Sequence, residues 1–397
     1  MEKRCSSSTV AVLVLMVILL VPVCSYSMEG RGVTKDTIKM GGIVDMTGPV
    51  TALTFPMIEG WRNHVRYLNE QGGINGRKIK LILEDDRYSI PMGVAAFKKL
   101  VFKDKVLALF GPVSTGETKA LFPQIEKQKM PSMTYSFARE MTTPYRKYVF
   151  TLGPTYEDQL FFGFDYIMKN AKNPKIAVVY PDNPYGKIAL FAARERAKFH
   201  NIKLAAETVI NFGEMDASSQ ALRLRMARIN YILIQENVGA TVTLLRNLKK
   251  LNHFPSFISL FYSCSEDVVK LGGNAAENYM GINNFSFWGD KGKGMAELRK
   301  IAKKYAPDKG PRSLTHIQGW VNSVIFAEAL KRAGKDLNPE SFVNALETLR
   351  DFDTGGICGP ITYTSSNHKA TEYCRVYKSD VNTKSLVPIT EWIKPVE

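Results

Sequence analysis

Apolar and polar positions follow two different periods along this chain. Between residues 56 and 71, Ile58, Trp61, Val65 and Leu68 recur every three or four positions, which predicts a helix with one buried stripe. Residues 37–44 instead form a short run rich in apolar and β-branched side chains, which predicts a strand. The two patterns follow each other in turn, so the chain predicts alternating strands and helices.

This alternation occurs in two series, of which the second begins at Lys175. The predicted strands are 37–44, 79–86, 106–110, 131–136, 175–180, 203–210, 231–235 and 257–262. The predicted helices are 56–71, 91–103, 185–200, 217–227 and 239–251, with three later ones at 295–305, 314–333 and 339–349. Apolar strands that alternate with helices are typical of parallel sheets covered on both faces. We therefore predict an α/β fold with two Rossmann-like lobes.

The later helices have no strands of their own, which suggests that they return to complete the first lobe. We expect residues 28–154 and 285–358 to form lobe 1, and residues 155–284 and 359–397 to form lobe 2, with 160–174 as a connection. A chain of this length is too long for one compact core, which also favours two domains.

The first 27 residues resemble a secretory signal peptide. Lys3 and Arg4 precede an apolar run at 9–23, and the small residues Ser25 and Ser27 suit cleavage. The run is shorter than the about 20 residues that span a bilayer, which disfavours an uncleaved anchor. A lipoprotein site at Cys24 is a weaker alternative, because the bulky Val23 precedes it. We expect a cleaved, periplasmic protein.

The formal net charge is +15, but the basic residues are scattered and form no long tract. Export and the lack of a nucleic-acid motif argue against a nucleic-acid partner, so the charge indicates a solvated basic surface or a mild attraction for anionic solutes.

Cys264, Cys358 and Cys374 follow the predicted signal peptide. Cys358 and Cys374 flank a predicted β-hairpin at 361–377, and an oxidising compartment would permit a disulfide between them. The alternative is that all three are buried free thiols. No cysteine or histidine spacing matches a metal site, and no metal is expected.

The stretch FGPVSTGET, residues 110–118, has P-loop spacing with Glu117 in place of the lysine. The loss of that cation argues against nucleotide binding. The hydroxyls of Ser114 and Thr115, with the N-terminus of the helix that follows, instead suit a carboxylate of single charge. The alternative is that one of these hydroxyls only caps the helix.

Ligands of open parallel sheets bind beyond the carboxyl ends of the strands. The loops at those ends contain no Ser-His-Asp set, no G-x-S-x-G turn and no H-E-x-x-H motif. The five histidines are scattered, and only His316 is a candidate for ligand contact. We therefore expect no catalytic residues, no enzyme activity and no cofactor.

Several segments occur in the order found in a known family: IKMGGIVDMTGPVT, NEQGGINGRKIKLILEDDR, ALFGPVSTGET, MPSMTYSFAREMT, KIAVVYPDNPYG and ICGPITYT. This set resembles the solute-binding proteins of branched-chain amino acid ABC transporters, over nearly the whole mature chain. The resemblance implies two α/β lobes joined by three crossovers, a small ligand in the cleft and delivery to a membrane permease. It also implies a monomer that is not an enzyme.

The resemblance assigns the ligand carboxylate to Ser114, Thr115 and the segment Tyr135–Ser136–Phe137. Further contacts carried over from the family fall on Leu53, Tyr185 and Asn237.

The sequence departs from the family where amino acid binders place acids against the ligand ammonium. Phe261 stands at one such position, and Thr155 or Tyr156 at the other. An unpaired ammonium in a closed cleft is costly. We therefore predict an acid without an α-amino group, held in a cleft lined by Leu53, Phe55, Tyr135, Phe137, Tyr156, Tyr185 and Phe261.

Three alternatives remain open. A standard amino acid could bind if Glu157 or Glu236 supplied the missing charge. A ligand-sensing module for a receptor would need a partner chain. A sugar-binding relative would need more polar side chains around the cleft than the sequence provides.

Overall fold

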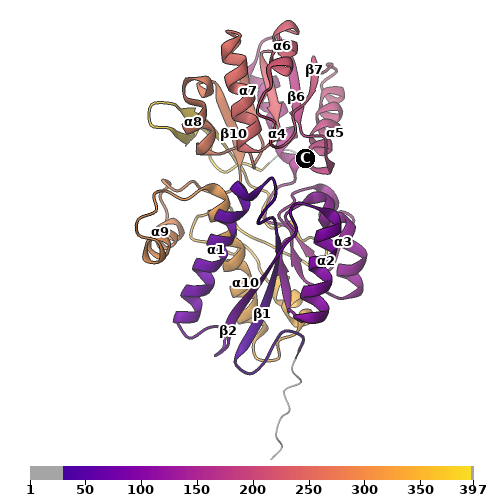
Figure 1. Cartoon of the computed structure of the whole chain (residues 1–397), viewed down its shortest axis with the longest axis vertical. Helices are drawn as coiled ribbons and strands as arrows, with labels where there is room; N and C mark the ends of the chain where they lie inside the picture. Colours follow the sequence, from indigo (N-terminus) through magenta and orange to yellow (C-terminus); the bar gives the residue numbers. More distant parts are fainter. Residues whose placement is uncertain (1–29, 395–397) are drawn as a thin grey trace, which may run out of the picture.

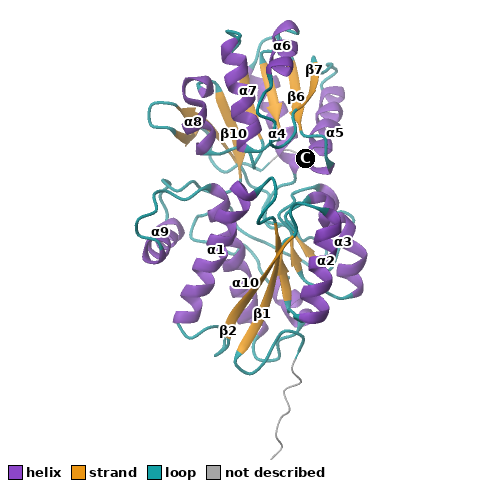
Figure 2. Ribbon diagram, in the orientation of Figure 1, coloured by secondary structure: helices purple, strands orange, loops and turns teal. Residues whose placement is uncertain are grey.

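The computed structural model describes residues 30–394 and has two lobes, one above the other in Figure 1. Each lobe contains a mostly parallel sheet with helices on its faces (Figure 2), as the alternating pattern predicts. The predicted signal peptide, residues 1–27, lies outside the described residues. No helix in the described part is long and apolar enough to cross a membrane.

The first lobe is built on a five-stranded parallel sheet with the order β2-β1-β3-β4-β5. Its strands are β1 (Thr37–Val44), β2 (Lys78–Asp85), β3 (Ala108–Phe110), β4 (Ser132–Met133) and β5 (Val149–Phe150). Val44 pairs with Asp85 at the carboxyl ends of β1 and β2, so the acidic residues that follow these strands lie side by side.

The helices of this lobe come from two distant parts of the chain. The early ones are α1 (Thr51–Glu70), α2 (Ile90–Lys98), its π-helical extension Lys99–Lys103, and α3 (Thr115–Lys127). The late ones are α9 (Lys293–Tyr305), α10 (Leu314–Ala333) and α11 (Pro339–Leu346). Helix α10 packs along α1 (Figure 2), and Gly60 and Gly319 allow their close approach, since a Cβ at Gly319 would lie 2.2 Å from the Met57 carbonyl oxygen.

Helix α1 begins at Thr51, so the predicted start at Pro56 is wrong. The Asp45 carboxylate accepts a hydrogen bond from Val50 N at 2.7 Å and another from Gly48 N. The Thr54 hydroxyl donates to the Asp45 carbonyl. These bonds hold an extra helical turn ahead of the proline, and that turn carries Leu53.

The second lobe is built on a seven-stranded sheet with the order β12-β11-β10-β9-β8-β6-β7. Its strands are β6 (Ile176–Tyr180), β7 (Ala206–Val209), β8 (Tyr231–Ile234), β9 (Ser256–Ser259), β10 (Tyr279–Asn283), β11 (Arg375–Asp380) and β12 (Ser385–Pro388). Its helices are α4 (Tyr156–Asn170), α5 (Pro184–Phe199), α6 (Ser218–Met226), α7 (Val238–Lys250) and α8 (Glu266–Gly272). Strands β11 and β12 pair antiparallel at one edge.

The chain passes between the sheets three times, after β5, after β10 and before β11. The segment 160–174, expected to be a connection, mostly belongs to α4, which packs on α5. Residues 361–369 do not form the predicted hairpin: Thr364 and Asn367 make a single bridge, and the Tyr363 hydroxyl donates to the Thr151 carbonyl beside β5 at 2.8 Å. In the lobe division that we propose, this segment therefore belongs with lobe 1.

Of the two alternatives left open for the cysteines, the structure shows the second, because Cys264, Cys358 and Cys374 are buried free thiols. Cys358 Sγ lies 3.4 Å from the Thr354 hydroxyl, whereas Cys374 Sγ lies beside the Ile393 carbonyl. Because the hairpin that was to bring the two cysteines together does not form, they pack against different parts of the chain. Burial raises the pKa of the Cys358 and Cys374 thiols to about 12.

Candidate functional site

The N-terminus of α3 forms the first-lobe side of the candidate site. Ser114 caps this helix, because its Oγ accepts a hydrogen bond from Glu117 N at 3.4 Å. Thr115 Oγ1 lies 2.8 Å from Ser136 Oγ, which also accepts a hydrogen bond from Ala138 N. The predicted group of hydroxyls therefore does come together. The first N–H groups of a helix have no partner within it and suit a negatively charged group.

A small cavity, which we name the inner cavity, lies between the two lobes beside Thr115. Its volume is about 30 Å³. It is lined by Val50, Leu53, Tyr88, Val113, Thr115, Tyr156, Tyr185, Phe212, Glu236, Asn237 and Tyr262. Of the predicted site residues, Leu53, Thr115, Tyr156, Tyr185 and Asn237 therefore reach this cavity together.

Aromatic rings form much of the inner cavity wall. The rings of Tyr156 and Tyr185 meet edge to face, with centroids 5.1 Å apart. The ring centroids of Tyr262 and Tyr185 are 6.2 Å apart, and those of Tyr88 and Phe212 are 6.0 Å apart. These rings come from both lobes, so the two lobes share the wall of this cavity.

Two polar groups of the second lobe line this cavity without a complete set of hydrogen bonds. Glu236 is fully buried, and its Oε1 has no hydrogen-bond partner among residues 30–394. The Tyr185 hydroxyl likewise has none in that part of the chain. Burial raises the pKa of Glu236 well above its usual range and so favours the neutral form of its carboxyl. Unpaired buried polar atoms at a cavity are suited to contact a ligand.

Other predicted residues lie elsewhere. The Tyr135 side chain turns into the core of the first lobe, where its hydroxyl accepts hydrogen bonds from Trp61 Nε1 and Asn322 Nδ2. Phe137 is fully buried and packs edge to face on Phe261, with centroids 5.0 Å apart. Ser114 and Ser136 stand behind Thr115 and are absent from the described lining of the inner cavity.

Three further residues also fall away from the inner cavity. Phe55 is 55% exposed on α1. Glu157 accepts a hydrogen bond from Arg139 N and lines a separate hollow beside Lys119 and Asn183. His316 is fully buried, and burial lowers its pKa to about 4. Of the two glutamates considered as a counter-charge, Glu236 is the one that lines the inner cavity.

Tyr88, Phe212 and Tyr262 are cavity residues that the sequence did not single out. Tyr88 and Tyr262 belong to loops that follow β2 and β9, so the rule that ligands bind at strand ends could have found both. Arg87 and Tyr88 have positive φ angles of 50° and 57°. Hydrogen bonds from Arg87 N to Asp85 and from Tyr88 N to Asp86 hold this left-handed turn, which no sequence signal marks.

Glu117, which replaces the P-loop lysine, is fully buried beside Asp86. Its carboxyl oxygens accept no hydrogen bond from the described residues. Burial, and then the charge of Asp86, raise the pKa of Glu117 to about 9, and burial raises that of Asp86 to about 6. Glu117 is thus a neutral core residue near pH 7.

Asp45, Asp85 and Asp86 are the described residues that could hold a metal ion, since one oxygen of each lies within 4.8 Å of the others. Backbone N–H groups already donate to Asp45 and Asp85. These carboxylates therefore stabilise the loops that follow β1 and β2.

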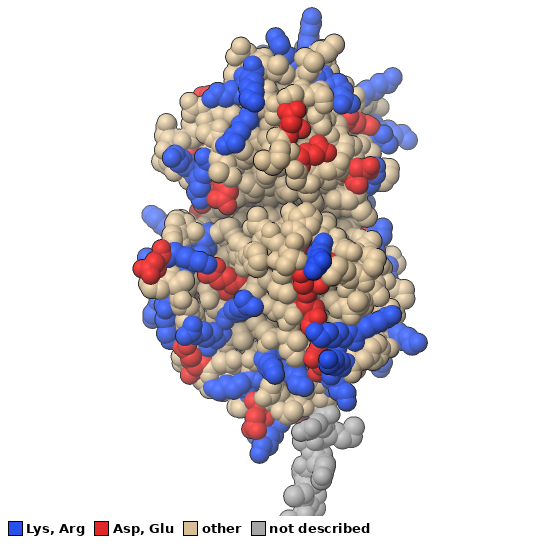
Figure 3. Space-filling view, viewed as in Figure 1, with Lys and Arg blue, Asp and Glu red and all other residues tan. Residues whose placement is uncertain are grey.

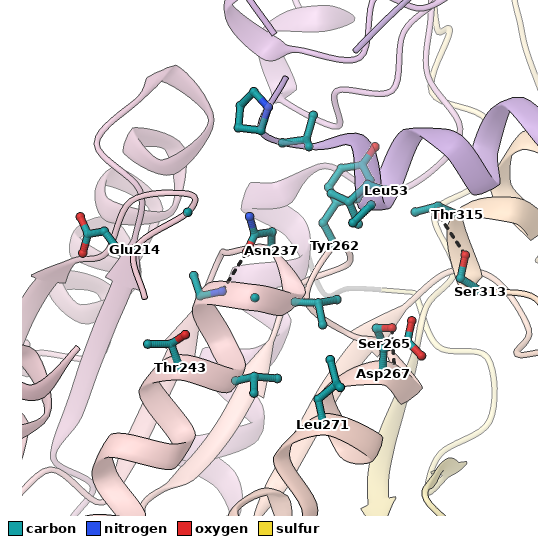
Figure 4. Close-up of a pocket in the computed structure, with 18 of the residues that line it drawn as sticks. Leu53, Glu214, Asn237, Thr243, Tyr262, Ser265, Asp267, Leu271, Ser313 and Thr315 are labelled. Atoms are coloured by element: carbon teal, nitrogen blue, oxygen red, sulfur yellow. Dashed lines mark hydrogen bonds between the residues drawn. The ribbon is translucent and has the colours of Figure 1, made fainter. Parts of the chain in front are cut away.

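A larger hollow, which we name the outer cavity, adjoins the inner one. Its volume is about 480 Å³, and it lies between the start of α1, the helices α7 and α8, and the start of α10 (Figure 4). Leu53, Asn237 and Tyr262 line both cavities, and Phe261 lines the outer one. In the space-filling view, the waist between the lobes carries few charged side chains (Figure 3).

Direct contacts join the lobes beside these cavities. The Tyr262 hydroxyl donates to the Tyr135 carbonyl at 2.5 Å and accepts a hydrogen bond from Gln318 Nε2 at 3.3 Å. Two α/β lobes that meet at an aromatic cavity, with a helix N-terminus on one side, form a site whose shape and chemistry suit a small molecule.

The chain belongs to the periplasmic binding protein family, whose model matches residues 37–384. Among curated relatives, it is 24% identical over 333 residues to the leucine-, isoleucine-, valine-, threonine- and alanine-binding protein of Pseudomonas aeruginosa, covering 83% of this chain and 86% of that protein. It is 22% identical over 342 residues to the Leu/Ile/Val-binding protein BraC3 of Rhizobium johnstonii, covering 86% and 91% of the two chains.

Solved structures share the fold. A branched-chain amino acid ABC transporter protein from Thermus thermophilus with bound valine aligns with a TM-score of 0.86 at 22% identity, covering 90% of this chain and 97% of that one. A fatty acid ABC transporter substrate-binding protein from Thermomonospora curvata aligns with a TM-score of 0.83 at 21% identity, covering 92% and 94%. The two-lobed fold of type I periplasmic binding proteins is thus confirmed.

Proposed function

We propose that this protein is the extracytoplasmic solute-binding component of an ABC importer and binds a small carboxylic acid between its lobes. In this proposal the signal peptide, residues 1–27, is cleaved after export. The mature protein acts as a periplasmic monomer and presents its bound solute to a membrane permease. The solute is an aromatic or aliphatic acid without an α-amino group.

The observation that carries the proposal is the position of Thr115 at the first turn of α3, facing the ring-lined inner cavity. The hydroxyl and the N–H groups of that turn suit a carboxylate, and the helix dipole favours its charge. Aromatic walls suit an apolar body behind the carboxylate. The unpaired Oε1 of Glu236, in the neutral form that burial favours, could donate a hydrogen bond to a ligand oxygen.

A second candidate is an amino acid such as leucine, and Glu236 is the observation that favours it. An ammonium group placed in the inner cavity could draw the proton off Glu236 and pair with its carboxylate. That pairing must offset the cost of ionising a buried carboxyl. One related structure contains bound valine and another is a fatty acid ABC transporter substrate-binding protein, so the related structures are compatible with both candidates.

Matched ligand pairs separate the candidates. The purified protein is unfolded and refolded to remove bound solute, and its thermal unfolding is then followed with leucine against isocaproate, and with phenylalanine against hydrocinnamate. A solute at about 100 times its dissociation constant stabilises the folded state by about 2.7 kcal/mol. We expect stabilisation by the acids alone, whereas stabilisation by the amino acids alone would refute the proposal.

Glu236→Gln provides an internal check, with Glu157→Gln as the matched control away from the cavity. Acid binding should survive both substitutions. If Glu236→Gln abolishes binding of an amino acid that Glu157→Gln leaves intact, Glu236 is the ammonium partner and the second candidate is correct.

A further inference from the structure

The inner and outer cavities adjoin each other and share four lining residues. Val50 and Leu53 of the first lobe, and Asn237 and Tyr262 of the second, line both of them. Figure 4 shows Leu53 and Tyr262 close to each other in this view, above the start of α7. A ligand that reaches from the inner cavity into the outer one would therefore contact these shared residues.

The two cavities differ greatly in size. The inner cavity, at about 30 Å³, has the volume that one water molecule occupies in the liquid. The outer cavity, at about 480 Å³, falls in the range of about 300 to 1,000 Å³ typical of small-molecule sites. Most of the room for a ligand is thus on the outer side of the junction.

The chemistry of the outer cavity suits an apolar group. Its walls include the buried side chains of Val242, Phe261 and Leu314, and the half-exposed Leu271 stands near them. Its charged lining residues do not favour a second carboxylate. Glu214 and Asp267 are acidic, and Arg246 already donates a hydrogen bond to the Leu271 carbonyl at 2.6 Å.

We infer that the solute is a monocarboxylic acid with an extended apolar tail, longer than a leucine side chain, and that the tail lies in the outer cavity. This inference rests on the proposed function, which places the carboxylate at Thr115. The tail passes between Leu53 and Tyr262 and contacts α7 and α8. Closure of the lobes removes the tail from water, so the apolar area buried contributes to affinity.

Calorimetric titration with butanoate, hexanoate, octanoate and decanoate tests the inference. Each buried methylene contributes about 0.8 kcal/mol, so affinity should rise about fourfold per methylene until the outer cavity is filled. Thr243 lines the outer cavity only, and Thr243→Trp should remove most of this gain while weakening butanoate, the shortest acid, the least. Leu271→Trp is a second blocking variant at a more exposed position.

Lys249→Trp is the matched control, since Lys249 is an exposed residue of the same helix and lines neither cavity. Lys249→Trp should leave the affinities for all four acids unchanged. If all four acids bind with equal affinity, or if Thr243→Trp and Lys249→Trp have the same effect, the inference is overturned and carboxylate binding stands. If none of the four acids binds but hydrocinnamate or isocaproate does, the inference fails and the proposed function stands, whereas both fail if none of these acids binds.

Discussion

Glu117 of the first lobe and Glu236 of the second are both fully buried glutamates with raised pKa values, yet they face different surroundings. Glu117 lies against another acid, Asp86, inside its lobe. Glu236 lines the inner cavity. The same chemical group is therefore a fixed part of the core in one lobe and an available ligand contact in the other. Burial and pKa do not distinguish these roles, whereas access to a cavity does.

The largest expected effect concerns the first-lobe side of the inner cavity. Thr115→Val keeps the shape of the side chain but removes its hydroxyl. A hydrogen bond to a charged group contributes about 1.5 to 3 kcal/mol, so affinity for the acid should fall about 10- to 100-fold. Calorimetry on the best acid of the matched panel measures this loss. If Thr115→Val binds as tightly as the native protein, the carboxylate lies elsewhere, and the first lobe does not provide its binding site at the inner cavity.

Glu117→Gln tests the conclusion that Glu117, in contrast to Glu236, is a core residue outside the site. Because Glu117 has a folded-state pKa of about 9, above its ordinary 4.5, the folded state retains a proton that the unfolded state releases. Stability contributed by this neutral form is complete below about pH 4.5 and is lost as pH rises toward 9. Glutamine cannot ionise, so the variant should be more stable than the native protein at pH 8, by on the order of 2 kcal/mol, and nearly equal to it at pH 4.5.

Thermal unfolding across that pH range, together with acid titrations, measures both properties of Glu117→Gln. Affinity should stay unchanged because Glu117 is absent from the lining of the inner cavity. A variant that loses stability equally at every pH would show that Glu117 is ionised in the fold. A loss of affinity would place Glu117 in the site.

The smallest effect is expected at Ser114, which stands behind Thr115. Ser114→Ala removes the cap of α3 and should lower the free energy of unfolding by about 1 kcal/mol. We also expect weaker acid binding, since the first turn of α3 becomes less ordered, with a smaller loss than for Thr115→Val. Urea unfolding and calorimetry give the two values. If Ser114→Ala binds the acid with unchanged affinity, Ser114 acts only as a helix cap.

Much of the fold was predictable because its signals are local. Buried parallel strands such as β6 and β8 are continuous apolar runs, and amphipathic helices such as α7 have a clear stripe. Strand β5 is two residues long and is too short to give a pattern. The start of α1 depends on the side chain of Asp45, five residues before Val50, so propensity and proline position alone misplace it.

The site was predictable as a set of loops more than as a set of side chains. Thr115, Tyr156, Tyr185 and Asn237 reach the inner cavity because each lies at the N-terminal end of a helix that follows a strand or crossover. Tyr135 does not, because Trp61 and Asn322 satisfy its hydroxyl inside the first lobe. Which way a ring turns depends on partners far away in sequence, and a local pattern cannot supply them.

The contacts of Tyr262 with Tyr135 and Gln318 involve protein atoms on both sides. They therefore favour the closed conformation of the two lobes whether or not a solute molecule is present. In an importer whose permease recognises the closed conformation, such contacts would let the solute-free binding protein dock at the permease and compete with the solute-bound form. Background ATP hydrolysis without transport would then rise with the concentration of the binding protein.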